Sequence, residues 1–384
     1  MTDEPVHVIR KLEQALADDD FAWSLLLVGE DQTDKLATLT GDLRGPFSRT
    51  GDGKQITSGF SYWGIGPTIA WANATNDPFY LVMKAGAESF LRHWRKVRPH
   101  VDKGGFHFVS LGVGTGVKDR TILEDMYRTH PNMFYVPVDM SSEMLRLGTT
   151  ESIRGARFPS TQVLPVQLDF SIRDNMDELG QMLARLVGEE PILYTLTGYT
   201  LANFDSDRHA LRTITRVLRP QDRLLLEVAT TSQLDQEAAE AAADEYHQTR
   251  AFAEFVTSAL RYNTDLKIDQ ELIDFRGEVE GDDALLVKIV WQNTTEVPIT
   301  MGLPDHTQVV LDPDDTILLY TTRKFSTERL KKLTTACELT PIEHAHTNFR
   351  YTRRPNPFGL DLLLLAPGSA GETVNTLADD IWAQ

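Results

Sequence analysis

The sequence predicts an α/β protein with a mostly parallel, doubly wound sheet, and two observations carry this prediction. From residue 106 onward, short apolar or β-branched runs alternate with helical patterns, as expected for parallel strands that helices cover on both faces. The first strand runs directly into glycines at 112, 114 and 116, and the next strand ends on Asp139. A strand, a glycine turn, a helix and a strand ending in an acid form the nucleoside-binding half of such a sheet.

Residues 1–100 are expected to form a mainly helical segment that belongs to a second, substrate-binding domain. Residues 1–45 are polar with a helical pattern, and helical periodicity returns over 68–99. Between them, residues 45–67 are rich in glycine, serine and aromatic residues, which indicates a loop. Tyr62 stands among glycines in this loop, so it belongs either to an aromatic flap over a pocket or to packing against the main domain.

Residues 101–230 are expected to form the nucleoside-binding core. Apolar runs place its five strands at 106–113, 134–139, 162–170, 191–198 and 223–229. Helical patterns follow the first three strands, over 117–128, from 142, and over 175–187. Helices between strands imply parallel pairing within this core.

Residues 231–310 interrupt this rhythm and are expected to form an inserted subdomain that recognises the substrate. The stretch 235–262 has strong helix propensity. Three later runs, at 283–292, 296–301 and 307–312, alternate like antiparallel strands. The second, smaller domain is therefore predicted to be of the α+β type.

Residues 311–384 are expected to complete a seven-stranded core sheet and to end in a helix. The sheet should resume with a strand at 315–325, followed by a helix at 326–339 and a last strand at 360–366. Residues 372–382 have the pattern of a terminal helix.

The charge balance bears on the partners of the protein. There are 38 lysines and arginines against 56 acids, which gives a net charge of −18. This balance argues against nucleic acid as a partner, because phosphate backbones require basic patches. It suits a small neutral or cationic substrate, although solubility alone explains it as readily. The oligomeric state cannot be read from the sequence.

Cysteine, histidine and apolar content indicate a cytoplasmic protein that binds no metal. Cys337 is the single cysteine, so no intrachain disulfide is possible, and its helical context predicts a buried thiol. There is no signal-peptide pattern and no run long enough to span a membrane. His344 and His346 lack companion ligands at metal spacing and are expected to be exposed, and the acidic run at 312–315 resembles a turn.

Four strand ends should surround a nucleoside pocket, since ligands of open α/β sheets bind at the carboxyl ends of the strands. Asp139 is placed to accept hydrogen bonds from ribose hydroxyls, and Asp169 to accept from an adenine amine. Lys118 is expected to face solvent, with contact to a cofactor carboxylate as the alternative. The remaining candidates around this pocket are Gly112, Gly114, Thr115, Phe170 and Thr197.

The glycine spacing favours one cofactor over another. The dinucleotide fingerprint has its third small residue at the position of Val117, whereas this chain reads G-x-G-x-G. That spacing resembles S-adenosylmethionine (SAM) methyltransferases more than NAD-dependent dehydrogenases. SAM, with S-adenosylhomocysteine as its product, is therefore the expected cofactor.

Several motifs together resemble a known family. SLGVGTGVKDRTIL, YVPVDMSSEML, LDF, LTGYTLANF and LLYTTRKF match, in order, the SAM-dependent histidine Nα-methyltransferases of ergothioneine biosynthesis. The resemblance covers about 60–350, and the T-x-x-N-F pattern ending at Phe204 is its more diagnostic part. It implies a Rossmann-like methyltransferase domain and a second domain built from the N-terminal segment and the insertion.

The resemblance also implies roles for individual residues. Gly112, Lys118, Asp139, Asp169 and Phe170 match the cofactor positions of the family, and Tyr62 matches a tyrosine that reaches the cofactor. Asn203 matches the asparagine that holds the α-amine and carboxylate of the amino acid, a task that suits an amide with one acceptor and two donors.

The substrate positions depart from the family. Its glutamate and serine that recognise imidazole are replaced by Tyr320 and Thr322, and its tyrosine that anchors the substrate carboxylate corresponds to Phe79, with Tyr80 adjacent. Without the acid, a buried imidazole donor would lack a partner. The substrate is therefore expected to be an amine other than histidine.

These observations predict an enzyme that N-methylates an amino acid or a small specialised metabolite. Asn203 would orient the amine, while Tyr62, Tyr199 and Tyr320 would form an aromatic pocket that favours cations. Transfer of the aminocarboxypropyl group of SAM and a non-catalytic SAM-binding protein remain the alternatives, and a dehydrogenase is disfavoured by Val117.

Overall fold

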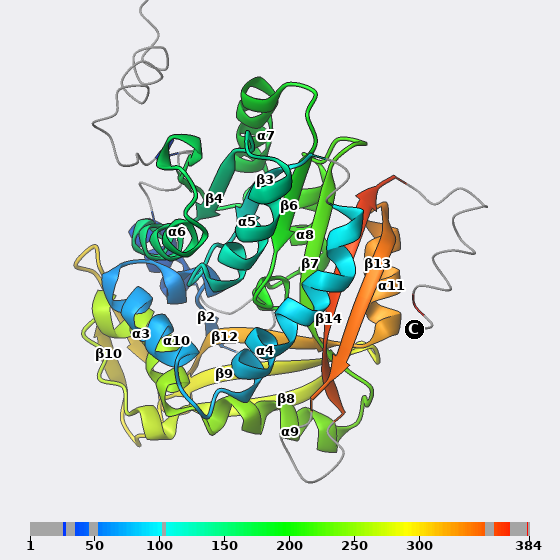
Figure 1. Ribbon diagram of the computed structural model, residues 1–384. Coiled ribbons are helices and arrows are strands. Elements are labelled where there is room, and N and C mark those ends of the chain that lie inside the picture. Colours follow the sequence, from blue (N-terminus) through cyan, green and yellow to red (C-terminus); the bar gives the residue numbers. More distant parts are fainter. Residues whose placement is uncertain are drawn as a thin grey trace, which may run out of the picture.

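The computed structural model describes residues 26–27, 35–45, 53–101, 105–349, 357–368 and 382. A central sheet with helices on both faces occupies the upper part of Figure 1, and a second group of strands and helices lies below it. Residues 372–381 of the predicted helix at 372–382, and the pattern over most of 1–34, lie outside the described residues.

Seven strands of a larger twelve-stranded sheet form its core, in the order β5-β4-β3-β6-β7-β14-β13, and the short β1 (Leu26–Leu27) pairs in parallel with β5 at its edge. The first five pair in parallel, and β14 pairs antiparallel with both β7 and β13. The bounds are β3 His107–Leu111, β4 Tyr135–Asp139, β5 Val166–Gln167, β6 Ile192–Leu196, β7 Arg223–Thr231, β13 Leu339–Asn348 and β14 Phe358–Pro367. This order confirms the prediction of a mostly parallel sheet. However, β13 was not expected as a strand, and it takes the place in the set of seven that the sequence assigned to residues 315–325.

Two apolar layers hold helices against this sheet. On one face, α4 (Leu81–Val97) and α5 (Val117–Thr129) pack against side chains such as Phe108 and Leu362, and α6 (Ser142–Ala156) packs beside α5. On the other face, α7 (Arg173–Val187), α8 (Asp207–Thr215) and α11 (Thr327–Ala336) cover side chains such as Val109 and Leu363. Cys337 lies in this second layer, as predicted, and burial raises the pKa of its thiol to about 11.

Serines begin three of these helices. Ser141, Ser206 and Ser326 each accept a hydrogen bond from the backbone N–H three residues later, which satisfies a donor that the first turn leaves free. Ser141 follows the core strand β4, Ser206 follows the loop after β6, and Ser326 follows a strand at 316–325. These caps therefore fix where α6, α8 and α11 begin.

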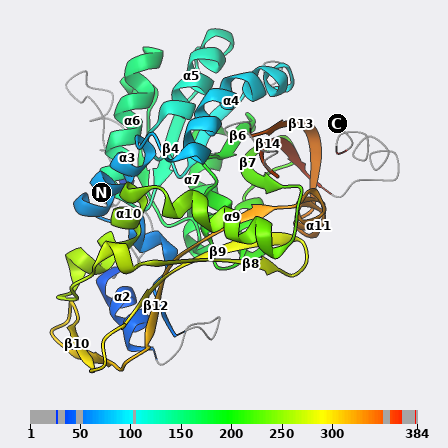
Figure 2. The same cartoon turned by 90° about the horizontal axis from the view of Figure 1, so that it is seen from below.

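The lower group combines elements from the N-terminal segment and from the insertion, the two parts of the predicted second domain (Figure 2). It contains α2 (Lys35–Arg44), α3 (Ile65–Thr75), α9 (Gln236–His247), α10 (Arg250–Asn263), β8 (Asp274–Glu280) and β9 (Ala284–Gln292). The helices α3 and α10 pack directly, with the rings of Trp71 and Phe255 4.8 Å apart. β10 (Ile299–Gly302) and β11 (Gln308–Leu311) form a separate antiparallel pair.

β12 (Thr316–Phe325) differs from the expected core strand. It pairs antiparallel with β9 from Thr316 to Phe325 and parallel with β2 (Lys54–Gln55). It joins β7, also in parallel, only where Phe325 pairs with Thr230. β14 occupies one edge of β7 and β6 occupies the start of the other, so only the end of β7 is left for β12. β12 therefore connects the two groups of strands, and the division into four segments stays a prediction.

Among the described residues, no helix combines the length and the apolar character that crossing a bilayer requires.

Candidate functional site

The glycine turn after β3 is held tightly between β4 and α6. Gly112, Gly114 and Gly116 all have positive φ angles, of 76°, 54° and 75°, and the N–H of Gly112 donates to the carbonyl of Val138 over 2.8 Å. A Cβ on Gly116 would lie 2.1 Å from the carbonyl oxygen of Gly148, so only glycine allows this approach. The turn lies at the carboxyl edge of the sheet, between the end of β3 and the start of α5.

Asp139 ends β4 beside this turn and is buried. Its carboxylate accepts the backbone N–H of Ser141 over 3.1 Å. Burial nevertheless raises the pKa of Asp139 to about 7, because a carboxylate loses solvation there. When it is ionised, the Asp139 carboxylate can also accept hydrogen bonds from hydroxyl groups of a ligand.

Asp169 follows β5 and is engaged by a residue that the sequence did not suggest. Its two oxygens accept from Lys35 of α2, over 2.6 Å, and from the hydroxyl of Ser171, over 2.6 Å. Both Lys35 and Asp169 are buried. Lys35 could not be found from a local motif, because 134 positions separate it from its partner. The adjacent Phe170 packs edge-on against Phe204, with ring centroids 5.9 Å apart.

Lys118 points inward, contrary to the expectation that it faces solvent. Its ammonium contacts the carboxylate of Glu227, and it lies 5.1 Å from the ring centroid of Tyr199 and 5.5 Å from that of Phe90. The cause is Glu227, a fully buried acid on β7 that also accepts the N–H of Gly198 over 2.7 Å. The predicted contact of Lys118 with a cofactor carboxylate stays a prediction.

Tyr62, Asn203 and Tyr320 meet in one hydrogen-bonded group, although they lie far apart in the sequence. The hydroxyls of Tyr62 and Tyr320 are 2.6 Å apart, and the amide of Asn203 donates to the Tyr62 hydroxyl over 3.3 Å. Burial raises the pKa of Tyr62 and of Tyr320, so both phenols remain protonated donors. The ring of Tyr62 packs against Trp71 and Phe255, at 5.2 and 4.9 Å between centroids.

The other substrate candidates lie outside this group. The side chain of Phe79 is 67% exposed, whereas Tyr80 is buried against Tyr246 and Phe252. Thr322 is buried and forms a side-chain hydrogen bond with Tyr246. Tyr199 turns toward α4, where its hydroxyl donates to the carbonyl of Val82 over 3.2 Å.

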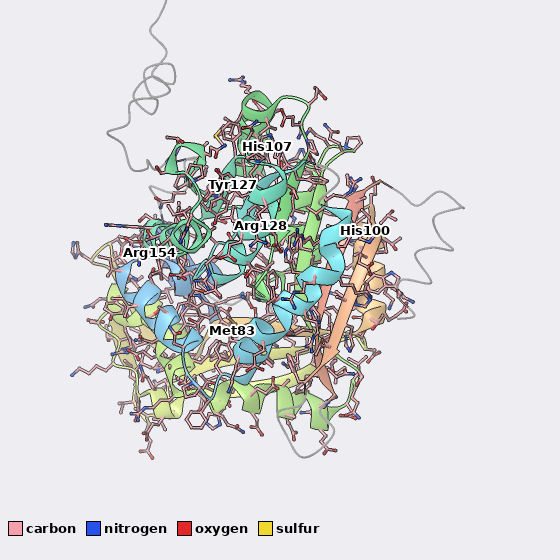
Figure 3. All side chains as sticks on the ribbon, viewed as in Figure 1. Met83, His100, His107, Tyr127, Arg128 and Arg154 are labelled. Atoms are coloured by element: carbon pink, nitrogen blue, oxygen red, sulfur yellow. The ribbon has the colours of Figure 1, made fainter. Side chains whose placement is uncertain are left out.

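A cavity of about 920 Å³ joins the strand ends to the second group of elements. It is lined by most of the predicted cofactor and catalytic residues: Gly112, Gly114, Thr115, Lys118, Asp139, Asp169, Phe170, Thr197, Tyr62 and Asn203. Side chains of α3 and α4 line it as well, among them Trp71, Thr75 and Met83, and Met83 is labelled in Figure 3. Tyr199, Phe79, Tyr80, Tyr320 and Thr322 are not part of this lining.

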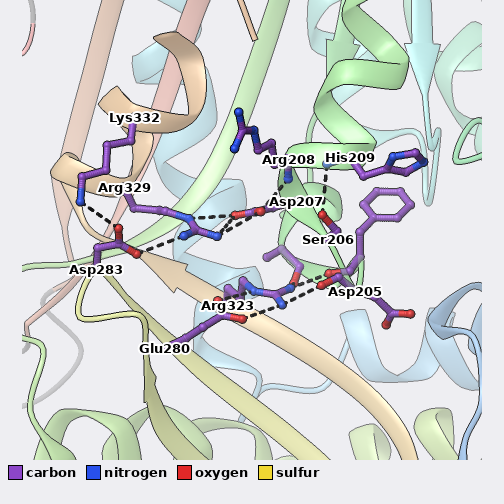
Figure 4. A network of polar contacts seen from close by, with 12 residues as sticks. Asp205, Ser206, Asp207, Arg208, His209, Glu280, Asp283, Arg323, Arg329 and Lys332 are labelled. Carbon is purple, nitrogen blue, oxygen red and sulfur yellow. Dashed lines mark hydrogen bonds and ion pairs between the residues drawn. The ribbon is translucent and has the colours of Figure 1, made fainter. Parts of the chain in front are cut away.

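Arg323 supports the loop that carries Asn203, and the sequence reading overlooked it. Its guanidinium donates to the carbonyls of Ala202, Phe204 and Asp205, at 3.3, 2.5 and 3.1 Å, and it pairs with Glu280 (Figure 4). Guanidinium offers five donors in a fixed plane, which suits several carbonyls at once. Strand β12 thereby fixes the loop after β6 from the side of the second domain.

The expectation for His344 and His346 is partly wrong. His344 is buried, and both imidazoles lie against the buried carboxylate of Asp361 on the neighbouring strand β14. Spacing along the chain could not reveal this companion, because it comes from strand pairing.

The residues of the cavity fit SAM in size and chemistry. The cavity is large enough for a nucleoside cofactor together with a small substrate. Asp139 offers acceptors for ribose hydroxyls, the glycine turn lets the backbone approach a ligand, and the ring of Phe170 provides an apolar surface. The Rossmann-like fold and this site define a SAM-dependent methyltransferase.

The sequence matches the family described as histidine-specific, SAM-dependent methyltransferases over residues 49–352, and the chain belongs to that family. This membership confirms the resemblance, the enzyme class and the cofactor. No curated protein matches the sequence.

Solved methyltransferase structures resemble this chain with low sequence identity and low TM-scores. A magnesium protoporphyrin IX methyltransferase from Synechocystis PCC 6803 with bound SAH is 7% identical, with 80% of this chain and 96% of that chain covered and a TM-score of 0.40. The sugar N-methyltransferase KedS8 from Streptoalloteichus sp ATCC 53650 is 15% identical, with coverages of 74% and 87% and a TM-score of 0.32. Such similarity carries no conclusion about substrate.

Proposed function

We propose that this enzyme transfers the methyl group of SAM to the amine of an amino acid or small metabolite other than histidine. The observation that carries the proposal is the bond between the Tyr62 and Tyr320 hydroxyls. Tyr320 stands where the resemblance places an imidazole-binding acid, and its hydroxyl is committed to Tyr62. A phenol held in this way offers no charge to an imidazole.

The acids around the cavity support the same reading, because each one already has a partner. Asp119 accepts from Tyr135, Asp139 from Ser141, Glu151 from Arg120, Asp169 from Lys35 and Asp205 from Gln55. Among the described lining residues of α3 and α4 there is no acid. That part of the lining therefore suits an apolar or aromatic group that carries the amine.

The residues of the chain would act by positioning. SAM supplies an electrophilic methyl group when it is bound. The Asn203 amide would hold the acceptor beside that group, and its oxygen can accept from an amine N–H. The rings of Tyr62 and Trp71 would attract a substrate that enters as an ammonium ion. This ion must lose a proton to water before its nitrogen lone pair can form the new bond to the methyl group, as the bond from that methyl to sulfur breaks and S-adenosylhomocysteine leaves. Correct placement of two reactants can lower a barrier by about 7–11 kcal/mol.

The acceptor is proposed to be a small molecule in the cytoplasm rather than nucleic acid or a membrane component. The net charge of −18 supports this, because it opposes association with phosphate backbones.

The test is turnover with SAM and a panel of amines, including histidine, tryptophan and phenylalanine, followed by mass analysis of the products. We expect methylated product from an aromatic or apolar amine and little from histidine. Product mass also separates methyl from aminocarboxypropyl transfer. Histidine as the best substrate would overturn the proposed specificity. SAM binding without any turnover would instead support a non-catalytic role.

A further inference from the structure

We propose that His344, His346 and Asp361 form a binding site for a divalent transition metal ion of the zinc type. The site lies between β13 and β14, at the edge of the core sheet, and it is independent of the methyl-transfer cavity. The three ligand atoms available from these residues all lie within 4.8 Å of one another.

The strand pairing arranges the three side chains on one face. Residues two apart on a strand point to the same side, so His344 and His346 project together. In the antiparallel register, His346 pairs directly with Asp361. The Nε2 atom of His344 lies 3.2 Å from one carboxylate oxygen, and Nδ1 of His346 contacts the other. A single ion between these atoms requires only small side-chain rotations.

The burial of the group favours a cation. Asp361 and His344 are almost completely buried, whereas His346 is exposed. A buried carboxylate is costly unless a positive charge compensates it. A divalent ion provides that charge, and the exposed imidazole leaves a route by which the ion can enter.

A further hydrogen bond prepares His346 as a ligand. Its Nε2 atom lies 2.9 Å from the side-chain oxygen of Asn348, an acceptor that holds the ring proton on Nε2. In the metal-free protein Nδ1 donates its proton to the Asp361 carboxylate, and an ion that binds here would displace that proton and take the Nδ1 lone pair. Metal-binding histidines commonly have such a second partner. Two imidazoles and one carboxylate, completed by water, match the tetrahedral preference of Zn²⁺ and not the oxygen-rich preference of Mg²⁺.

A second group of similar composition fails the same test. His107, His130 and Glu190 also lie within 4.8 Å of one another. However, Nδ1 of His107 accepts the backbone N–H of Phe134 over 2.9 Å, so its Nε2 carries the proton and donates to Glu190. His107 therefore has no lone pair for a metal. It begins β3, so it lies at the amino edge of the parallel strands, where Figure 3 labels it.

The experiment is calorimetric titration of tag-free, EDTA-treated full-length protein with Zn²⁺. Co²⁺ serves as a spectroscopic probe, because its visible bands report coordination geometry. We expect one equivalent to bind in the wild type and in the control His130→Ala. The same binding should be lost in His346→Ala, an exposed position where the chain is expected to fold. Asn348→Ala should weaken it by about tenfold to a hundredfold.

Absence of one-to-one binding would overturn the proposal, as would binding that persists in His346→Ala. Equal loss of Zn²⁺ binding in His130→Ala would show that binding depends on the group of His107, His130 and Glu190. Thermal unfolding provides a second readout. Zn²⁺ should raise the midpoint of the wild type and of His130→Ala but leave His346→Ala unchanged.

Discussion

At the scale of single residues, Asp139 shows how burial and ligand binding oppose each other. Its carboxyl group is buried at the end of β4, and its pKa is raised to about 7. Ribose hydroxyls are donors, so they bind the ionised form best. Below about pH 7 the free enzyme holds a proton that SAM binding must displace.

We therefore expect SAM affinity to be constant above about pH 7 and to fall by up to about tenfold per pH unit below it. Calorimetric titration across this range measures the slope. In Asp139→Asn, binding should be weaker and independent of pH. A wild-type affinity that stays flat down to about pH 5 would contradict the assigned pKa of Asp139.

Tyr320 provides the second prediction at this scale. Replacing Tyr320 by Glu, together with Thr322→Ser, introduces the glutamate and the serine that the family resemblance implies for imidazole. Histidine turnover should rise by at least about tenfold, since a buried hydrogen bond to a charged group contributes about 1.5–3 kcal/mol. Steady-state kinetics on histidine would measure the gain.

Tyr320→Phe is the matched control, because it removes only the hydroxyl that contacts Tyr62. It should leave histidine turnover low. If the double variant folds, as judged by its melting transition, and still ignores histidine, then Tyr320 does not exclude the imidazole.

At the scale of elements, the loop after β6 depends on a strand of the other domain. Arg323 of β12 is 4% exposed and donates to three carbonyls of the loop that carries Asn203. Removing it leaves those acceptors without their donor, at a cost of about 1–3 kcal/mol in unfolding free energy. The loop should also lose the geometry that holds Asn203.

Arg323→Ala should therefore lower both stability and kcat/KM, whereas Arg329→Ala should lower stability mainly. Arg329 is the matched control, because it forms comparable ion pairs with Asp207 and Asp283 but does not contact the Asn203 loop (Figure 4). Chemical denaturation and steady-state kinetics separate the two effects. An equal loss of kcat/KM in both variants would mean that Arg323 acts only through overall stability.

At the scale of the whole molecule, the sequence predicted what is encoded locally. The glycine turn, Asp139 and Asp169 stand directly after strands, so their meeting at one edge followed from a parallel sheet. Lys35 and Glu227 were missed because their partners are distant in sequence. Lys35 meets Asp169, and Glu227 meets Lys118, only in the folded chain.

The same limit explains β12. Its apolar pattern correctly indicated a strand, but pattern alone cannot choose between two sheets. The choice depends on which edges of β7 are already occupied by β6 and β14. The histidine pair on β13 is a related case, because Asp361 becomes its neighbour only through the antiparallel register.

The last prediction concerns the contact between α4 and the edge of the core sheet. His93 of α4 is buried, with Nε2 2.6 Å from the hydroxyl of Thr347 on β13. Burial lowers its pKa from 6.5 to about 4. The charged groups that face it are Glu227, Asp361, Arg92 and His346, and the two acids only partly offset the effect of burial.

Because the folded-state pKa of His93 lies below the unfolded value, protonation favours the unfolded chain. The stability contributed by neutral His93 is complete above pH 6.5 and is lost as the pH falls toward about 4. Denaturation of EDTA-treated protein at about pH 7 and about pH 5 should show this loss, and His93→Gln should reduce it. His209→Gln, at an exposed position, should retain the wild-type dependence. If His93→Gln also retains it, groups other than His93 carry the acid sensitivity.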